Sequence, residues 1–167
     1  MKFSNRFALL ATAVVALTSL SSVAIAATGS GTANATVITP MTITTGATLA
    51  FGSFAATAAA GSVVIATNGT RSTPNTNVVL SALGAGSAAA FTVSGANNAT
   101  FSITTPGGFS VTGPGTAMPF TLTLPSTVGT LSGAGSFALN VGGTLAVGAS
   151  QVAGGYTGAF NVVVEYN

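Results

Sequence analysis

The chain has 167 residues, of which 48% are hydrophobic and only 2% are charged. It contains three basic residues, one acidic residue, no His and no Cys. Acid–base catalysis needs a titrating group beside its partner, transition metals need clusters of His, Cys or carboxylate, and disulfide scaffolds need Cys. The composition therefore predicts no enzyme, no cofactor and no metal site, and it favours a structural or binding protein.

The first 26 residues have the pattern of an export signal. Lys2 and Arg6 form a short basic region, and an apolar run follows over residues 7–23. The small residues of a cleavage site come next, at Ala24, Ala26 and Ala27. We expect a signal peptide over residues 1–26, no integral membrane span in the mature chain, and export through the periplasm to the cell surface or medium.

Removal of this leader changes the charge balance. The sequence pI of 9.7 depends on Lys2 and Arg6, and without them only Arg71 and Glu165 remain as charged side chains. The mature side chains then sum to zero, so the apparent basicity does not indicate nucleic acid as a partner. A chain of this length predicts a single domain with its own core.

We expect a flexible N-terminal arm over residues 27–35 and one β-domain over residues 36–167. Residues 36–44 are the first strong strand candidate. Pro40 interrupts it and cannot donate to a central ladder, so this segment is predicted to be an edge strand or to contain a switch point. Residues 55–60 are the only helix-like stretch, and they are too short to form a stable helix alone.

From residue 91 onward, apolar and polar residues alternate repeatedly. Such alternation places one set of side chains on the core face of a strand and the other set outside. The apolar members are Phe91 and Val93, Phe101 and Ile103, Phe120, Leu122 and Leu124, Phe137, Leu139 and Val141, Leu145 and Val147, and Phe160, Val162, Val164 and Tyr166. We expect an all-β, antiparallel sandwich of the immunoglobulin or Greek-key type, with about seven to nine short strands.

Turn-forming residues separate these segments, because Gly permits the backbone conformations that tight turns need. The spacing of residues 101–104 and 109–112 predicts successive hairpins. The expected turns lie at Asn68-Gly69, Ser94-Gly95, Pro106-Gly107-Gly108, Gly113-Pro114-Gly115, Gly133-Ala134-Gly135 and Gly142-Gly143.

Arg71 is the one basic side chain after the leader, and two interpretations remain open for it. A lone surface charge is usually solvated and contributes little to stability. Alternatively, its guanidinium ties together several loop carbonyls.

The C-terminal segment has the most specific pattern in the chain. An alternating strand over residues 160–166 is flanked by a glycine fourteenth from the end and a penultimate tyrosine. This combination resembles the C-terminal signature of chaperone–usher pilins. The resemblance implies a strand that pairs with a periplasmic chaperone and takes part in assembly, formed here by Gly154, Tyr156, Phe160, Val162, Val164 and Tyr166.

A wider resemblance covers nearly all of the mature chain. It is to a family of pilin-like secreted proteins of Gram-negative bacteria that is known only as a domain of unknown function. The matching pieces are residues 49–54 (LAFGSF), 90–95 (AFTVSG), 142–148 (GGTLAVG) and 155–162 (GYTGAFNV).

These features predict a pilin-like subunit that polymerises by strand addition into a fimbria or a biofilm-matrix fibre. The partners expected are further copies of the chain, a periplasmic chaperone and an usher. The arm would supply Ala33, Ala35 and Val37, or alternatively Ile38, to the neighbouring subunit. Alternatives are a monomeric adhesin, in which residues 156–166 are simply the last strand of a complete sandwich, and a small outer-membrane barrel.

Overall fold

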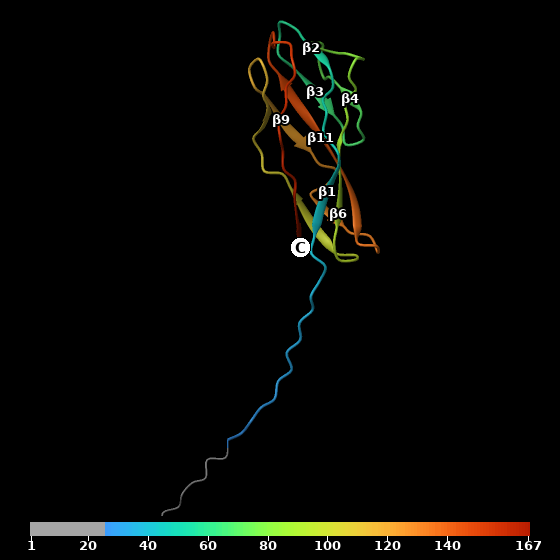
Figure 1. The fold of residues 1–167 in the computed structure, drawn as a ribbon, viewed down its shortest axis with the longest axis vertical. Coiled ribbons are helices and arrows are strands. Elements are labelled where there is room, and N and C mark those ends of the chain that lie inside the picture. Colours follow the sequence, from blue (N-terminus) through green and yellow to red (C-terminus); the bar gives the residue numbers. More distant parts are fainter. Residues whose placement is uncertain (1–25) are drawn as a thin grey trace, which may run out of the picture. The chain divides into compact units, whose positions relative to one another are not determined.

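The structure, a computed structural model, describes residues 26–167, and every helix or strand element in that range is a β-strand (Figure 1). Val37–Asn167 forms one compact unit, while residues 26–36 belong to a separate unit and have no regular structure. The prediction of an all-β, antiparallel sandwich is confirmed. The strands are β1 (Thr42–Ala47), β2 (Phe54–Ala56), β3 (Gly61–Ile65), β4 (Arg71–Ser72), β5 (Val78–Leu80), β6 (Ala89–Ser94), β7 (Thr100–Thr104), β8 (Phe109–Val111), β9 (Met118–Thr123), β10 (Val128–Thr130), β11 (Ser136–Val147) and β12 (Val163–Tyr166).

The longest strand, β11, organises the main sheet. Its first half pairs antiparallel with β6, and β1 pairs with the other edge of β6. Its second half pairs with β3 on one edge and β9 on the other. β4 and β8 extend this sheet beyond β3 and β9, giving seven strands.

The prediction of a turn at Gly142-Gly143 is wrong, because both residues lie inside β11. The pairing of β11 changes at this point from β6 to β3 and β9. A Cβ on Gly142 would meet the carbonyl oxygen of Ile65, and one on Gly143 would lie 2.8 Å from that of Thr121. The two glycines therefore allow neighbouring backbones to approach closely within a strand, which is another recognised use of glycine.

A three-stranded antiparallel sheet, in the order β10-β7-β12, packs against the main sheet, and β2 and β5 form a separate ribbon. The predicted hairpin between residues 101–104 and 109–112 does not form. β7 pairs with β10 and β12, whereas β8 pairs with β9. The Pro106-Gly107-Gly108 segment thus connects two different sheets.

Buried apolar side chains form two clusters, which we call the β7 core and the β9 core. The β7 core lies between the three-stranded sheet and the β6 end of the main sheet, and the β9 core lies beneath β3 and β9. The β7 core contains Ala89, Val93, Phe101, Ile103, Leu131, Leu139 and Val141. The β9 core contains Val63, Val78, Met118, Phe120, Leu145 and Val147. Burial of one such large side chain contributes about 1.5–3 kcal/mol.

The beginning of the domain differs from expectation. The strand predicted over residues 36–44 starts only at Thr42, after Pro40, where pairing with Ser94 begins. Pro40 lacks the N–H that a ladder would need. The helix-like residues 55–60 contain the end of β2 and a bend. Residues 26–167 contain twelve strands, more than the seven to nine predicted. The additional strands are two or three residues long, and such short segments show too little alternation to be recognised in the sequence.

Candidate assembly groove

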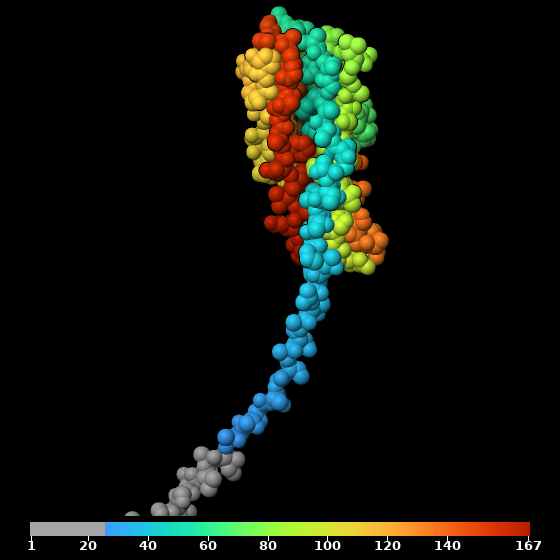
Figure 2. Space-filling model, in the orientation of Figure 1, coloured from blue at the N-terminus to red at the C-terminus, as the bar shows by residue number. Residues whose placement is uncertain are grey.

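A groove opens between two extended segments of the domain. One wall is residues 49–56, after β1, and the other is residues 151–160, before β12. The space between them has a volume of about 780 Å³. Figure 2 shows the first wall in cyan to teal and the second in red, side by side on the visible face.

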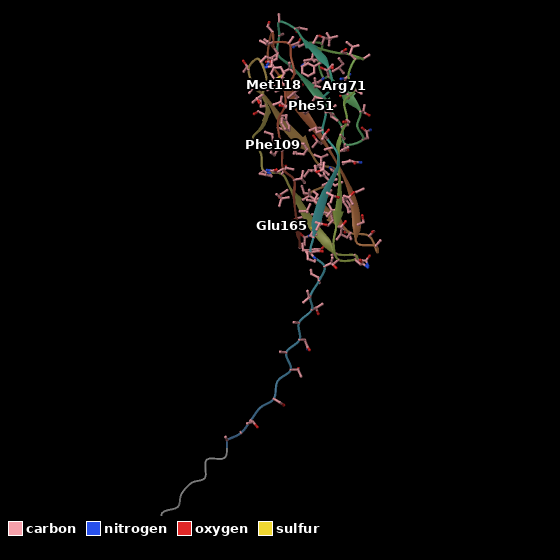
Figure 3. The ribbon with its side chains drawn as sticks, viewed as in Figure 1. Phe51, Arg71, Phe109, Met118 and Glu165 are labelled. Atoms are coloured by element: carbon pink, nitrogen blue, oxygen red, sulfur yellow. The ribbon has the colours of Figure 1, made fainter. Side chains whose placement is uncertain are left out.

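The floor of the groove is formed by aromatic and aliphatic side chains of the β9 core. The ring of Phe120 packs edge-on against those of Phe51 and Phe160, with centroid distances of 5.9 and 6.3 Å. Phe109 stacks against Phe120 at 5.5 Å, and Met118 is 2% exposed (Figure 3). Phe51 and Phe160 remain partly exposed. A concave apolar surface of this kind is typical of a binding site.

The first wall is hydrogen-bonded along one edge only. Ser53 and Thr57 form backbone hydrogen bonds with the chain around β5, and β2 pairs with β5 between them. In antiparallel pairs, alternate residues direct their N–H and C=O groups to opposite edges. The backbone groups of Phe54 and Ala56 therefore point away from β5, toward the edge that borders the groove.

The second wall is also hydrogen-bonded along one edge only. Thr157 exchanges two backbone hydrogen bonds with Thr112, at 2.8 and 2.9 Å. The neighbouring backbone groups of Tyr156 and Gly158 point to the opposite edge. Among residues 26–167, no backbone hydrogen bond joins residues 49–56 to residues 151–160, and the two segments meet just beyond the walls, where the Ser150 N–H donates to the Thr57 carbonyl at 2.7 Å. The groove thus lies between two backbone segments that are not hydrogen-bonded to each other, above an apolar floor.

Side-chain hydrogen bonds order the second wall. The Tyr156 hydroxyl donates to the Val152 carbonyl and accepts from the Gln151 amide, each at 2.9 Å. Gly154 has a φ of 148°, and a Cβ there would lie 2.5 Å from Pro114 Cγ. This conformation and this contact both require glycine.

Arg71 orders the first wall, so its interpretation as a solvated loop charge is wrong and the stapling interpretation is confirmed. Its Nη1 donates to the carbonyl oxygens of Gly84 at 2.7 Å, Ser53 at 3.2 Å and Phe51 at 3.4 Å. Its Nη2 donates to the Ser81 carbonyl at 2.6 Å. The side chain therefore connects the groove wall to the loop after β5.

The guanidinium is surrounded by carbonyl dipoles, and Glu165, the only carboxylate side chain of residues 26–167, lies toward the other end of the domain (Figure 3). Two glycines make room for the arginine. Gly52 has a φ of 70°, and a Cβ there would collide with Nη1; a Cβ on Gly86 would lie 2.9 Å from Cδ of Arg71.

The structure divides the residues of the predicted assembly strand between two places. Gly154, Tyr156 and Phe160 line the groove. Val162, Val164 and Tyr166 pack on the β7 core, and Phe160 contacts both cores. Only residues 163–166 form a strand, although burial alternates as predicted over residues 160–167.

The penultimate residue, Tyr166, joins three parts of the domain. Its ring packs on the β7 core, and its hydroxyl accepts a hydrogen bond from the Ala96 N–H at 2.6 Å. The same hydroxyl donates to the Thr39 carbonyl at 2.8 Å. Tyr166 therefore fixes the chain immediately before β1.

The predicted arm residues Ala33 and Ala35 are exposed and belong to residues 26–36, which have no regular structure. Val37, at the start of the compact unit, is 96% exposed. Of the predicted cleavage site, Ala26 and Ala27 are exposed, whereas Ala24 and the rest of the predicted leader lie outside the described residues.

Sequence reasoning missed the first wall of the groove. Phe51 and Phe54 are three residues apart with Gly52 between them, so they give no period-2 signal. The hydrogen-bond partners of Arg71 are carbonyls between 10 and 20 residues away, and carbonyls have no sequence signature. The LAFGSF motif over residues 49–54 was the only available pointer to this wall.

Two further observations apply to residues 26–167. No helix in this range is long and apolar enough to cross a membrane. The same range contains no group of three His, Cys, Asp or Glu residues that could hold a metal ion.

The fold defines a protein of the antiparallel β-sandwich class, with an apolar groove between residues 49–56 and 151–160. Residues 41–166 match the family model of a domain of unknown function, DUF4402, and the chain belongs to this family. Comparisons with curated proteins and with solved structures find no significant match.

Proposed function

We propose that this chain is an exported structural protein of the cell surface, a pilin-like subunit that polymerises by strand addition. The proposal includes a leader over residues 1–26 that is removed on export, and assembly partners that are further copies of the same chain. A periplasmic chaperone and an usher are the proposed partners during assembly.

The groove is the observation that carries this proposal. Strand addition needs an exposed backbone edge for hydrogen bonds and pockets for alternate side chains. The walls at residues 49–56 and 151–160 each have one unpaired edge, and the floor beneath them is apolar. A strand placed between the two walls could bond to both while its inward side chains contact Phe51, Phe120 and Phe160.

The proposed occupant is the arm of a second copy, residues 27–40. In this range no residue belongs to a strand or helix, and Val37 and Ile38 are 96% and 53% exposed. An extended segment of this length spans about 46 Å, which exceeds the roughly 26 Å of the eight-residue wall and the roughly 33 Å of the ten-residue wall. A head-to-tail contact of this kind does not close on itself and therefore produces a filament.

The charge distribution is compatible with such pairing. Proteins commonly protect exposed strand edges with charged side chains, especially Lys. In residues 26–167 the only charged side chains are Arg71, which is bonded to carbonyls, and Glu165 on β12. Neither wall of the groove contains a charged side chain.

Electron microscopy and sedimentation of the protein from sheared cells test this proposal. We expect filaments from the native chain and monomers from Val37→Asp, because a carboxylate cannot enter an apolar floor without a large desolvation cost. Thr36→Asp is the matched control, since in an extended strand its side chain faces the opposite side. A native chain that stays monodisperse at high concentration, or filaments from Val37→Asp equal to those of the native chain, would refute the proposal.

A further inference from the structure

Among residues 26–167, Arg71 is the only cationic side chain, and it donates hydrogen bonds to backbone carbonyls of two separate segments. Phe51 and Ser53 belong to the groove wall, and Ser81 and Gly84 belong to the loop that follows β5. The half-buried Arg71 side chain has four carbonyl partners and no carboxylate among them, which indicates a dedicated role for this side chain.

We propose that Arg71 is the positioning residue of the groove: it holds residues 51–53 in the place where the groove can accept a strand from a second copy. The inference rests on the proposed function and adds the residue that prepares the site. Arg71 itself lies in β4 and would not touch the incoming strand.

The wall needs such support because regular pairing is interrupted there. Ala50 bonds to Ser87, and pairing resumes where β2 begins at Phe54. Between them, Gly52 adopts a positive φ, and the chain bends out of the ladder. Ser53 forms two backbone bonds with the β5 loop, and Arg71 supplies two bonds to the wall and two more to that loop.

A shift of this wall would also move the floor. The ring of Phe51 packs against Phe120 at 5.9 Å, and Phe120 packs against Phe160 at 6.3 Å. Leu49, Phe54 and Ala56 of the same wall also pack on the β9 core, so the wall backbone and the apolar surface of the groove are directly connected. Loss of the Arg71 contacts would loosen the binding edge and the pocket beneath it together.

Two glycines leave the space that the Arg71 side chain occupies. Gly52 and Gly86 come from different segments, and a Cβ on either one would contact the Arg71 side chain too closely. Hydrogen bonds from a charged donor are stronger than neutral ones. Because a wall that is already ordered loses less freedom on binding, we expect Arg71 to affect strand affinity beyond its effect on stability.

Uptake of a labelled synthetic peptide of residues 27–40 by the full exported chain tests the inference. The native chain is compared with Arg71→Gln, with Arg71→Lys, and with Ile103→Val, which removes a methylene from the β7 core far from the groove. At urea concentrations giving equal stability, we expect affinity to fall at least about tenfold in Arg71→Gln. The peptide affinity of Arg71→Lys should lie between those of the native chain and Arg71→Gln, because one ammonium group cannot reproduce the forked contacts of a guanidinium.

Peptide affinity in both Arg71 variants equal to that in Ile103→Val would overturn the inference and leave the proposed function intact. No uptake by the native chain would instead refute the proposed function, and the inference with it. If Arg71→Gln does not fold, Arg71→Lys and amide hydrogen exchange at residues 51–53 decide the matter. Faster exchange there with unchanged exchange in β7 supports the inference, and unchanged exchange at both places overturns it.

Discussion

The β7 core and the β9 core are covered by the same C-terminal segment in different ways. At the β7 core, residues 163–166 pair with β7, and Phe101 of β7 is fully buried. Over the β9 core, residues 151–160 bond to the sheet mainly through Thr157 and leave Phe160 partly exposed. One continuous segment thus closes one end of the domain and leaves the other end open.

The local sequence accounts for this difference. Residues 162–164 are three consecutive valines, and β-branched side chains favour a paired strand. Residues 154–158 contain three glycines, which have no side chain to pack and weaken a strand interior. Composition, rather than length, therefore determines which core is closed.

The largest expected difference is in stability. Phe101→Ala removes a fully buried ring from the β7 core and should lower the free energy of unfolding by about 3–5 kcal/mol. Phe51→Ala removes a partly exposed ring from the groove and should lower it by less than about 2 kcal/mol. Urea denaturation of both variants measures the contrast.

The second readout of these variants is assembly. Phe51→Ala should reduce filament formation despite its smaller effect on stability, because Phe51 contributes to the groove floor. Equal losses of stability in the two variants would mean that the β9 core is as closed as the β7 core, and the comparison would fail.

Gly52→Ala is expected to disrupt the first wall specifically. A non-glycine residue at positive φ costs about 1–3 kcal/mol, and the added Cβ would collide with Arg71. Limited trypsin digestion measures this disruption, because Arg71 is the only Lys or Arg after Arg6 and therefore the only tryptic site there. The native chain should resist cleavage after Arg71, and the variant should be cut.

Gly107→Ala is the control for this experiment, since a Cβ on Gly107 meets no atom within 4 Å. Rapid cleavage of the native chain would show that the Arg71 contacts do not protect this site.

Tyr166→Phe tests the closed end with a smaller change. The variant keeps the ring in the β7 core but leaves the Ala96 N–H and the Thr39 carbonyl without the hydroxyl. We expect a loss of about 1–2 kcal/mol and faster hydrogen exchange at Ala96, with exchange at the groove unchanged. Faster exchange at residues 151–158 would contradict the separate behaviour of the two ends.

The smallest expected effect is that of pH. The sequence has no His and no Cys, the side chains that ordinarily titrate between about pH 6 and 9. Protons bound by the folded and unfolded chains should therefore differ little, and stability should change by less than about 0.5 kcal/mol from pH 6 to 8. A steeper dependence in thermal unfolding would indicate a titrating group that the composition does not suggest.

Alternation predicted the buried faces well. Phe101 and Ile103 are buried with Ser102 between them, because a period of two directly reflects strand geometry. The Asn68-Gly69 turn is also confirmed, with Gly69 at a φ of 84°.

Pairing between strands was less predictable. Residues 101–104 and 109–112 looked like a hairpin but belong to different sheets, because local spacing does not encode partners distant in sequence. Gly142 and Gly143 were predicted to form a turn, because the sequence does not distinguish a glycine that permits close backbone approach from a glycine that permits a turn. The groove depends on such long-range pairing, so only its C-terminal wall was found.

The uninterrupted length of β11 has a consequence for how the domain unfolds. This one strand supplies Leu139 and Val141 to the β7 core and Leu145 and Val147 to the β9 core. Neither core can melt while the other keeps its share of the strand intact, so heating should produce a single cooperative transition. A ligand that binds only the folded state raises the melting temperature by mass action. A strand seated in the groove should therefore delay melting of the far, closed end as much as that of the end it touches.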